Sequence, residues 1–515
     1  MPTVTFTPGT IWCKLLADKT AFALLDAEFS YFMEGYQRMP AYKSKQWDGK
    51  KHLLTKYNNF PSGLLEDAIG IVEAAGYKAV VNDGRVRPKH PLKRWNLKGA
   101  DEREHQTEAY TAAIEAGRGI VYHATGAGKT EVMAGIIQML DLPSLVLVNQ
   151  TLIATQTQKR LSERLGIRVG LLTGTKKIDG RVVVATFQTL LSQMKNDKEN
   201  QTQHLKKYLN KFQVMCIDEA HHTLAATYQR VANTCEAYYR FAFSATPFKS
   251  ENFKDEADPA SRLHIIGTTG PVIDTFTPGE GVAKKLLVPA HITMVKWHPD
   301  KPNDGWKGPD FEINDWDYTW VGKKTELVMK KGKEVRVPLP LDQQEPGLYT
   351  VGIAEHTVRN SFVVDSACAL YDEGLTTLIL VTSIDHGLFL QKAIQRQAGK
   401  KVLFLQGLNT QAERDAAKRL FEEGTHPILI ATTIFDEGVD IPSIEGLVFA
   451  QGGKAQHRVI QRIGRGMRPK DGKLQLEVID FWDTHSKVLW KHSKERMKAY
   501  RSDPVGYKVE IVEVT

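Results

Sequence analysis

Short apolar runs alternate with amphipathic stretches along most of the chain, from about residue 100 to residue 485. Four such runs come before residue 250 and four after residue 376: 144-SLVLVNQ-150, 181-RVVVATF-187, 213-QVMCID-218, 239-YRFAFSAT-246, 377-TLILVTS-383, 401-KVLFLQG-407, 427-PILIATT-433 and 446-GLVFAQG-452. Continuous apolar runs followed by helical patterns are typical of parallel strands that helices cover on both faces. The pattern therefore predicts an α/β protein with two sheets.

Two segments break this rhythm. The first 95 residues form a separate piece that ends in the basic linker 85-RVRPKHPLKR-94. Residues 297–348 are rich in Gly, Pro, Asp and Lys, and 318-YTWVGKKTELVMKKGKEVRVPL-339 predicts β-hairpins with turns at Gly322 and 331-KGK-333. We therefore expect five parts: an N-terminal domain (1–95), a first lobe (96–260), a linker with a Trp-rich β insertion (261–350), a second lobe (351–485) and a basic helix with a tail (486–515).

Composition and charge indicate the cellular compartment and the type of partner. The chain has 515 residues and a net charge of +8, which favours a polyanionic partner. Its four cysteines are scattered, as expected for reduced thiols in a cytosolic compartment. The N-terminus lacks the pattern of a signal peptide, and no run reaches the ~18 apolar residues of a membrane span. We expect a cytoplasmic protein without membrane contact.

The stretch 121-VYHATGAGKTEV-132 has the features of a phosphate-binding loop, with His123 where the strict pattern begins with glycine. Gly126 and Gly128 let the backbone approach phosphates, while Lys129 is placed to reach the β- and γ-phosphates and Thr130 to ligate Mg²⁺. The loop is completed by Thr125 and Ala127. An apolar strand precedes it and a helix follows it, which is the context that such a loop needs. The alternative is a chance glycine-rich turn, but His123 removes no group that contacts phosphate.

A carboxylate pair follows a second strand, in 214-VMCIDEAHH-222. The strand delivers Asp218 toward Mg²⁺, with Glu219 beside it as the candidate base. An acidic pair in a surface turn is the alternative. A pair at a strand end, downstream of a phosphate-binding loop, favours ATP hydrolysis instead.

Five blocks together resemble the superfamily 2 helicases. They occur in family order over about residues 100–485: ATGAGKT at 124–130, DEAH at 218–221, SATP at 244–247, ATTIFDEGVDIP at 431–442 and QRIGRGMR at 461–468. The resemblance implies two RecA-like parallel-sheet lobes with ATP in the cleft between them. With the flanking segments, the expected fold is α/β, with a small α+β N-terminal domain and a β-rich insertion.

The resemblance also implies roles for single residues. Gln106 matches the glutamine that reads adenine, although an exposed glutamine at a helix start is the alternative. Arg465 and Arg468 match the arginine fingers, and if the segment is helical their spacing puts both on one face. Gln461 is implied near the attacking water and Asp440 near the ribose. Coupling of the nucleotide site to nucleic acid is implied for His221, Ser244 and Thr246.

Nucleic-acid contacts are expected from loops at the sheet ends, through amides and small hydroxyls on phosphates. The candidates are Asn149, Gln150, Thr173, Gly174, Thr186, Gln188, Ser383, Gln406, Gly407, Thr432 and Thr433. The family usually has a threonine after a proline where this chain has Asn149 and Gln150. Each candidate could instead be a capping or turn residue.

The N-terminal segment indicates a particular group within the superfamily 2 helicases. The stretches 46-QWDGKKHLL-54 and 61-PSGLLEDAIGIVEAAGY-77 are similar to the front domain of UvsW-type helicases, which are phage recombination and branch-remodelling motors related to XPB. Basic residues interleaved with aromatics suit a phosphate backbone, and the expected contacts are Trp47, Lys50 and Lys51. The alternative is a small structural cap with a solvated lysine edge.

The sequence therefore predicts an ATP- and Mg²⁺-dependent DNA helicase or translocase. Its expected substrates are single-stranded and branched duplex DNA (forks, junctions, D-loops and R-loops) in recombination, repair or replication. We expect a monomer, with single-strand-binding or recombination proteins as partners. The alternatives are an RNA helicase, the motor subunit of a restriction or defence system, and a nucleic-acid-binding scaffold with a silent ATPase.

Overall fold

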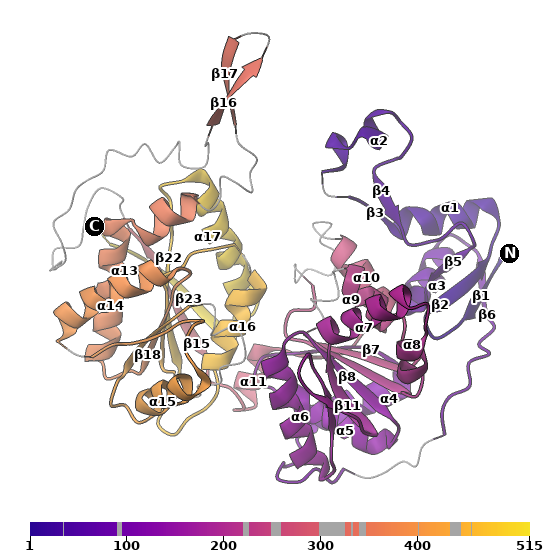
Figure 1. Ribbon diagram of the computed structural model, residues 1–515, viewed down its shortest axis with the longest axis horizontal. Coiled ribbons are helices and arrows are strands. Elements are labelled where there is room, and N and C mark those ends of the chain that lie inside the picture. Colours follow the sequence, from indigo (N-terminus) through magenta and orange to yellow (C-terminus); the bar gives the residue numbers. More distant parts are fainter. Residues whose placement is uncertain are drawn as a thin grey trace. The chain divides into compact units, whose positions relative to one another are not determined.

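The computed structural model describes residues 1–33, 35–89, 95–219, 226–248, 259–297, 325–330, 333–338, 347–399, 401–432, 444–454 and 456–514. The chain forms two compact units (Figure 1). The first contains Met1–Ala124 and Gly128–Phe276, and the second contains Thr277–Thr515 with the short segment Thr125–Ala127. Within the described ranges, no helix has both the length and the apolar character needed to cross a bilayer.

The first unit is built on an eight-stranded sheet in the order β10-β9-β11-β8-β12-β13-β7-β14. Its strands are β7 (Arg118–His123), β8 (Ser144–Val148), β9 (Gly170–Leu172), β10 (Lys177–Ile178), β11 (Val182–Thr186), β12 (Val214–Asp218), β13 (Tyr239–Ser244) and β14 (Val272–Phe276). All pairs are parallel except β10 with β9, so the predicted parallel sheet is confirmed. Its central strands are buried along their length because helices cover both faces.

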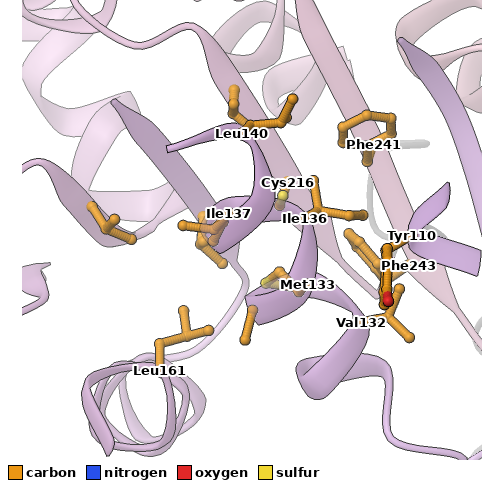
Figure 2. Close-up of a cluster of buried hydrophobic side chains, with 14 of the residues drawn as sticks. Tyr110, Val132, Met133, Ile136, Ile137, Leu140, Leu161, Cys216, Phe241 and Phe243 are labelled. Atoms are coloured by element: carbon orange, nitrogen blue, oxygen red, sulfur yellow. The ribbon is translucent and has the colours of Figure 1, made fainter. Parts of the chain in front are cut away.

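The helices of this lobe are α4 (Glu104–Ala116), α5 (Lys129–Leu140), α6 (Thr151–Leu165), α7 (Phe187–Glu199), α8 (His204–Leu209), α9 (Ala226–Ala232) and α10 (Pro259–Thr269). Helices α4, α5 and α6 contribute to one core, and α7, α8 and α9 to the core on the other face. Figure 2 shows side chains of α5 gathered between Leu161 of α6 and Phe241 and Phe243 of β13. The helix that follows the phosphate-binding loop is therefore fixed by core packing.

The N-terminal domain has a four-stranded sheet in the order β5-β2-β1-β6, formed by β1 (Thr3–Pro8), β2 (Trp12–Leu16), β5 (Asn59–Pro61) and β6 (Lys78–Val81). Helices α1 (Lys19–Glu28) and α3 (Leu65–Ala74) pack on it, after the short helix η2 (Ser62–Leu64). Strands β3 (Ser30–Phe32) and β4 (Lys50–His52), with η1 (Tyr36–Arg38) and α2 (Pro40–Lys43), form an arm that extends from the domain (Figure 1). The predicted α+β domain is thus confirmed.

The N-terminal domain and the first lobe share one apolar core. Residues of β7, β13 and α10 join the core of the small domain, including Ile120 and Ile266. The contact is close, since a Cβ at Gly63 would lie 1.8 Å from the carbonyl oxygen of Ile266. Arg118 of β7 donates a hydrogen bond to the Thr10 carbonyl at 3.2 Å, and burial lowers the pKa of Arg118 to about 9. The domain is therefore joined to the strand that leads into the phosphate-binding loop.

The second unit is built on a seven-stranded sheet in the order β19-β20-β18-β21-β22-β15-β23, with every pair parallel. The strands are β15 (Ala290–Lys296), β18 (Thr377–Leu380), β19 (Leu403–Leu405), β20 (Ile428–Ala431), β21 (Gly446–Phe449), β22 (Leu476–Phe481) and β23 (Tyr507–Glu513). The helices are α11 (Pro278–Ala283), η4 (Thr350–Ala354), α13 (Thr357–Asp372), α14 (Ile384–Ala398), α15 (Gln411–Glu422), α16 (Gln456–Gly466) and α17 (Lys487–Tyr500). The predicted second α/β lobe is therefore confirmed.

The structure places three boundaries differently from our prediction. Residue 260 lies inside α10, and β14 completes the first sheet beside β7, so the first lobe extends to Phe276. The second lobe begins earlier than residue 351, because β15 pairs with β22 before the insertion. It also ends later than residue 485, since β23 pairs with β15. The strands that set these boundaries pair with strands distant in the sequence, and local sequence patterns do not reveal such pairings.

The insertion is described in part. Strands β16 (Thr325–Lys330) and β17 (Lys333–Pro338) pair antiparallel, which confirms the predicted hairpin in that stretch. Its turn residues and Gly322, together with Trp306, Trp316 and Trp320, lie outside the described residues.

Candidate nucleotide-binding site

The phosphate-binding loop connects β7 to α5, as predicted. Gly126 and Gly128 adopt left-handed backbone conformations, with φ of +91° and +88°, and α5 begins at the next residue, Lys129. A Cβ at Gly128 would lie 2.3 Å from Nε2 of Gln106. Glycine is therefore favoured at 128 by its left-handed backbone conformation, and a larger residue there would also displace the end of the Gln106 side chain. Gln106 is buried on α4, so it is not the exposed helix-start glutamine of the alternative interpretation.

The loop is arranged to receive an anion. The Lys129 ammonium donates to two carbonyls of its own segment, to His123 at 3.1 Å and to Ala124 at 3.4 Å. It is therefore held over the loop, at the N-terminus of α5, where amide N–H groups and the helix dipole favour negative charge. Thr130 is the second residue of α5. These residues fit the phosphates of a nucleotide.

His123 explains why the loop departs from the strict glycine pattern. Its side chain is fully buried, and its Nε2 forms a hydrogen bond with an Asp274 carboxylate oxygen on the neighbouring strand β14. Its ring also lies 5.7 Å from the ring of Phe276, the residue that it faces in the register. The imidazole thus joins β7 to β14, while the backbone carbonyl of His123 accepts a hydrogen bond from Lys129. The expectation that His123 removes no phosphate-binding group agrees with this geometry.

The carboxylate pair stands at the end of β12, a strand paired on both sides. Burial and the neighbouring Glu219 carboxylate raise the pKa of Asp218 to about 7, and the Lys129 ammonium opposes the rise. The Glu219 N–H donates to the Asp218 carboxylate at 3.1 Å, and Glu219 has φ of +53°. A left-handed non-glycine residue is strained, and such strain is concentrated at functional sites. The pair therefore belongs to the same site as Lys129.

Ser244 is the last residue of β13, the strand beside β12, and Thr246 follows that strand. Both are buried, and the Ser244 hydroxyl accepts a hydrogen bond from the Thr246 N–H at 3.1 Å. The turn that they form lies at the same edge of the sheet as Asp218, because neighbouring parallel strands end together. His221, the third residue expected to couple the sites, lies outside the described residues.

The nucleic-acid candidates of the first lobe all lie near the carboxyl ends of strands. Asn149 and Gln150 stand between β8 and α6, and Gly174 follows β9. Two of the threonines have local partners: the Thr173 hydroxyl accepts from the Lys176 N–H at 3.1 Å, and Thr186 caps α7. Gln188, in the first turn of α7, is exposed and donates to the Tyr228 hydroxyl at 3.1 Å. Turn and capping roles therefore account for the two threonines.

The candidates of the second lobe lie in equivalent places. Ser383 caps α14 by accepting from the His386 N–H at 3.3 Å. Gln406 and Gly407 follow β19, and Thr432 follows β20. Thr433 and the ribose candidate Asp440 lie outside the described residues.

Helix α16 carries Gln461 and Arg465, but it ends at Gly466. Arg468 therefore lies beyond the helix, so the condition under which the spacing would put both arginines on one helical face is not met. Glycine at 464 and 466 and the proline at 469 explain the early end, because both residue types disfavour a continued helix.

Lys473 is a residue that the sequence analysis did not identify. Its buried ammonium donates to the carbonyls of Gly466, at the end of α16, and of Ile444. Burial lowers the pKa of Lys473 to about 8, against the opposing effect of Glu445. It thus connects the end of α16, within the arginine-bearing block, with Ile444, two residues after the block 431–442. A lysine seven residues after the end of a helix gives no local sequence signal of this role.

Three family models match the chain in order. They are DNA helicase UvsW, N-terminal (residues 10–82), type III restriction enzyme, res subunit (100–249), and helicase conserved C-terminal domain (363–470). The matches cover most of the N-terminal domain, most of the lobe with the phosphate-binding loop, and the part of the second lobe that contains β18 to β21 and α16.

Similar proteins include helicases and a restriction enzyme. The chain is 23% identical to the ATP-dependent DNA helicase uvsW of Enterobacteria phage T4, over 97% of each chain. It is 24% identical to the DNA 3'-5' translocase XPB2 of Sulfurisphaera tokodaii, over 73% of this chain and 81% of the relative. Among solved structures, the ATP-dependent type ISP restriction-modification enzyme LlaBIII bound to DNA has the same fold, with a TM-score of 0.55 and 15% identity over 81% of this chain and 32% of that chain.

The geometry and these matches agree on one family. A glycine loop with its lysine, an Asp-Glu pair at a strand end and a second parallel lobe with an arginine-bearing helix are present together, and the three models follow one another along the same chain. The chain belongs to the superfamily 2 helicases, as an ATP-dependent enzyme related to the UvsW and XPB helicases.

Proposed function

We propose that the protein is an ATP- and Mg²⁺-dependent DNA helicase or translocase that remodels branched DNA in recombination, repair or replication. The observation that carries this proposal is the pairing of the ATP site with a UvsW-type N-terminal domain, matched over residues 10–82. Two similar proteins, in phage T4 and Sulfurisphaera tokodaii, are named as a DNA helicase and a DNA translocase. The same domain favours this function over the motor subunit of a restriction system and over an RNA helicase.

Within this proposal, separate residues of the first lobe bind the phosphates, hold the metal and activate the attacking water. Bound ATP with Mg²⁺ supplies the phosphoanhydride bond and a divalent charge. Lys129 binds phosphate oxygens, while Thr130 and Asp218 hold the metal, since Mg²⁺ is usually held by one or two protein groups and the phosphates. Among the described residues no three acidic, histidine or cysteine side chains form a metal cage. Glu219 orients the attacking water and accepts its proton.

The remaining assignments keep their predicted roles within this proposal. Gln106 reads adenine, Asp440 binds the ribose and Gln461 contacts the water. Arg465 and Arg468 stabilise the charge that develops on the γ-phosphate. His221, Ser244 and Thr246 couple hydrolysis to DNA, and the loop residues after the strands contact its backbone. We further propose a monomer in the cytoplasm (the host cytoplasm if a phage encodes it), with recombination or single-strand-binding proteins as partners. The four buried free cysteines are compatible with a reducing compartment.

The arm of the N-terminal domain has the composition of a DNA contact. Residues 30–57 contain six Lys or Arg and two Asp or Glu, a net charge of +4 within a chain of net charge +8. The same stretch contains six aromatic residues. Half of the net positive charge is thus concentrated in the arm and the five residues that follow it (Figure 1), where it can bind phosphates beside aromatic rings.

The aromatic side chains of the arm differ in their exposure and in their contacts. Trp47 uses its indole N–H to donate to the Lys50 carbonyl at 2.8 Å, so it holds the arm together. Phe32 is 53% exposed and stacks on Tyr36 at 4.6 Å, with the Lys50 ammonium 5.1 Å from its ring centre. We therefore assign base stacking to Phe32 and phosphate binding to Lys50 and Lys51, with Trp47 as their support.

The proposed function is tested by steady-state ATP hydrolysis with a panel of nucleic acids at fixed salt. The panel is single-stranded DNA, duplex DNA, a fork, a four-way junction and single-stranded RNA. We expect the strongest stimulation with the fork or the junction, because the arm adds contacts that a simple strand does not use. Stimulation mainly by RNA would contradict the proposed substrate.

The arm is tested by the double substitution Lys50→Gln/Lys51→Gln. We expect the affinity for a fork to fall about tenfold, and the slope of log affinity against log salt to become shallower by up to about 1.8, since each phosphate contact contributes about 0.9. Basal ATP hydrolysis should be unchanged. The matched control is Lys14→Gln/Lys78→Gln, which removes the same charge from exposed strand positions of the same domain. An equal loss in both variants would assign the effect to net charge rather than to the arm.

A further inference from the structure

We propose that the exposed face of α17 is a second DNA-binding surface, which contacts the phosphates of duplex DNA through four lysines. The surface, here called the lysine face, consists of Lys487, Lys491, Lys494 and Lys498 with Trp490. This inference rests on the proposed function, because it assumes that the substrate is DNA. It adds a site outside the helicase blocks and outside the N-terminal domain.

The opposite face of α17 is fixed rigidly to the lobe. Arg496 is buried and donates to the Asp480 carboxylate at 2.7 and 3.1 Å and to the Gly453 carbonyl at 2.6 Å. The Tyr500 hydroxyl donates to the same carboxylate at 2.6 Å. Leu489 is also buried on this side. The lysine face is therefore presented by a helix whose position is set by a buried ion pair and apolar packing.

The lysine face is almost purely basic. Its lysines are exposed and follow one another at intervals of three or four residues, which places them on one side of the helix. The one acidic residue of α17, Glu495, lies at its flank and pairs with Lys498 at 3.0 Å. Among the described residues, no ion pair involves the other three lysines. A solvated helix face usually mixes both signs of charge, and this face does not.

This arrangement has a cost for the isolated protein. Lys487 with Lys491, Lys491 with Lys494, and Lys494 with Lys498 are like-charge neighbours, which destabilise a helix at these spacings. Trp490 is 41% exposed, and the Lys494 ammonium lies 3.4 Å from its ring centre. A polyanion would offset the repulsion, and the cation–π contact holds one ammonium in place for it.

The geometry fits a phosphate backbone. Successive lysines are about one helical turn apart, and the row from Lys487 to Lys498 is about 16 Å long at 1.5 Å per residue. A straight row of point charges suits the evenly spaced phosphates of a duplex, since lysine binds phosphate without needing the fixed geometry of arginine. Contacts of this type position DNA without reading its sequence.

The test is the quadruple substitution of the lysine face to glutamine, in the full chain, with affinity for a DNA duplex measured over a salt series. We expect affinity to fall about tenfold or more at moderate salt, and the slope of log affinity against log salt to become shallower by up to about 3.6, from four contacts of about 0.9 each. Basal ATP hydrolysis without DNA should be unchanged. The melting temperature should stay the same or rise, because the like-charge neighbours are removed.

Two further variants separate the causes. Lys195, Lys198, Lys206 and Lys207, on α7 and α8, are exposed helix lysines; changing them to glutamine removes the same charge elsewhere and should leave the slope nearly unchanged. Changing the lysine face to arginine keeps the charge and should preserve affinity. Equal losses in the two glutamine variants, or an unchanged slope in the first, would overturn the proposal. Failure of the wild-type protein to bind DNA at all would instead overturn the proposed function.

Discussion

The substitution Lys129→Ala is expected to reduce ATP hydrolysis by about 100-fold or more, both with and without DNA. The ammonium is the cation that the loop holds over its own carbonyls, 3.1 and 3.4 Å away, at the N-terminus of α5. Removing one group that stabilises transition-state charge typically costs about 10²–10³ in rate. The measurement is steady-state phosphate release, with ATP concentration varied so that kcat and KM are determined separately.

The same variant should bind DNA within about threefold of the wild type, since none of the proposed DNA contacts involves this lysine. Its core is expected to be intact, because Lys129 stands at the first position of a helix that Ile136, Ile137 and Leu140 anchor. Lys159→Ala is a suitable control, as this lysine is 78% exposed on α6 of the same lobe. Turnover that survives in the Lys129 variant would show that the phosphate-binding site is assigned wrongly.

The features that the sequence revealed are those with a local cause. A left-handed glycine before a helix, an apolar run that ends in Asp218, and a two-residue turn between short strands each depend on neighbours in the chain. For this reason the loop at 124–130, the end of β12 and the hairpin of β16 and β17 were predictable from short windows.

The features that the sequence did not reveal depend on distant partners. In the sequence, His123 is only a departure from the glycine pattern. Its role follows from the hydrogen bond to Asp274, which lies 151 residues later in the chain. Strand β14 joins its sheet by pairing with β7, and β23 joins its sheet by pairing with β15. The sequence of neither strand indicates which strand it pairs with. The contacts of Lys473 with Ile444 and Gly466 likewise come from packing. Thr186 and Ser383 are different, because each caps the helix that follows it through the N–H three residues later, which is the capping alternative that the sequence already offered.

The second large effect is expected for Glu219→Gln, which should lower kcat by about 100-fold or more and leave ATP binding within a few-fold of the wild type. A general base contributes about 10²–10⁴ to a rate, and an amide of the same shape cannot accept the proton of water. Glutamine keeps the size of the side chain and the same backbone requirement at φ of +53°, so the strained position is not altered further. Single-turnover hydrolysis and direct binding of ATP would measure the two quantities separately.

The interpretation of this variant depends on Asp218, the neighbouring carboxylate. The Glu219 charge is one of the causes that raise the pKa of Asp218, so replacing it with a neutral amide makes Asp218 ionise more readily. Loss of turnover could therefore not be attributed to a protonated metal ligand. Glu163→Gln on α6, where the side chain is 57% exposed, is the matched control and should retain full activity. If Glu219→Gln hydrolysed ATP at the wild-type rate, the base would have to be sought elsewhere, whereas weakened ATP binding with unchanged kcat would place Glu219 in nucleotide binding rather than in the chemical step.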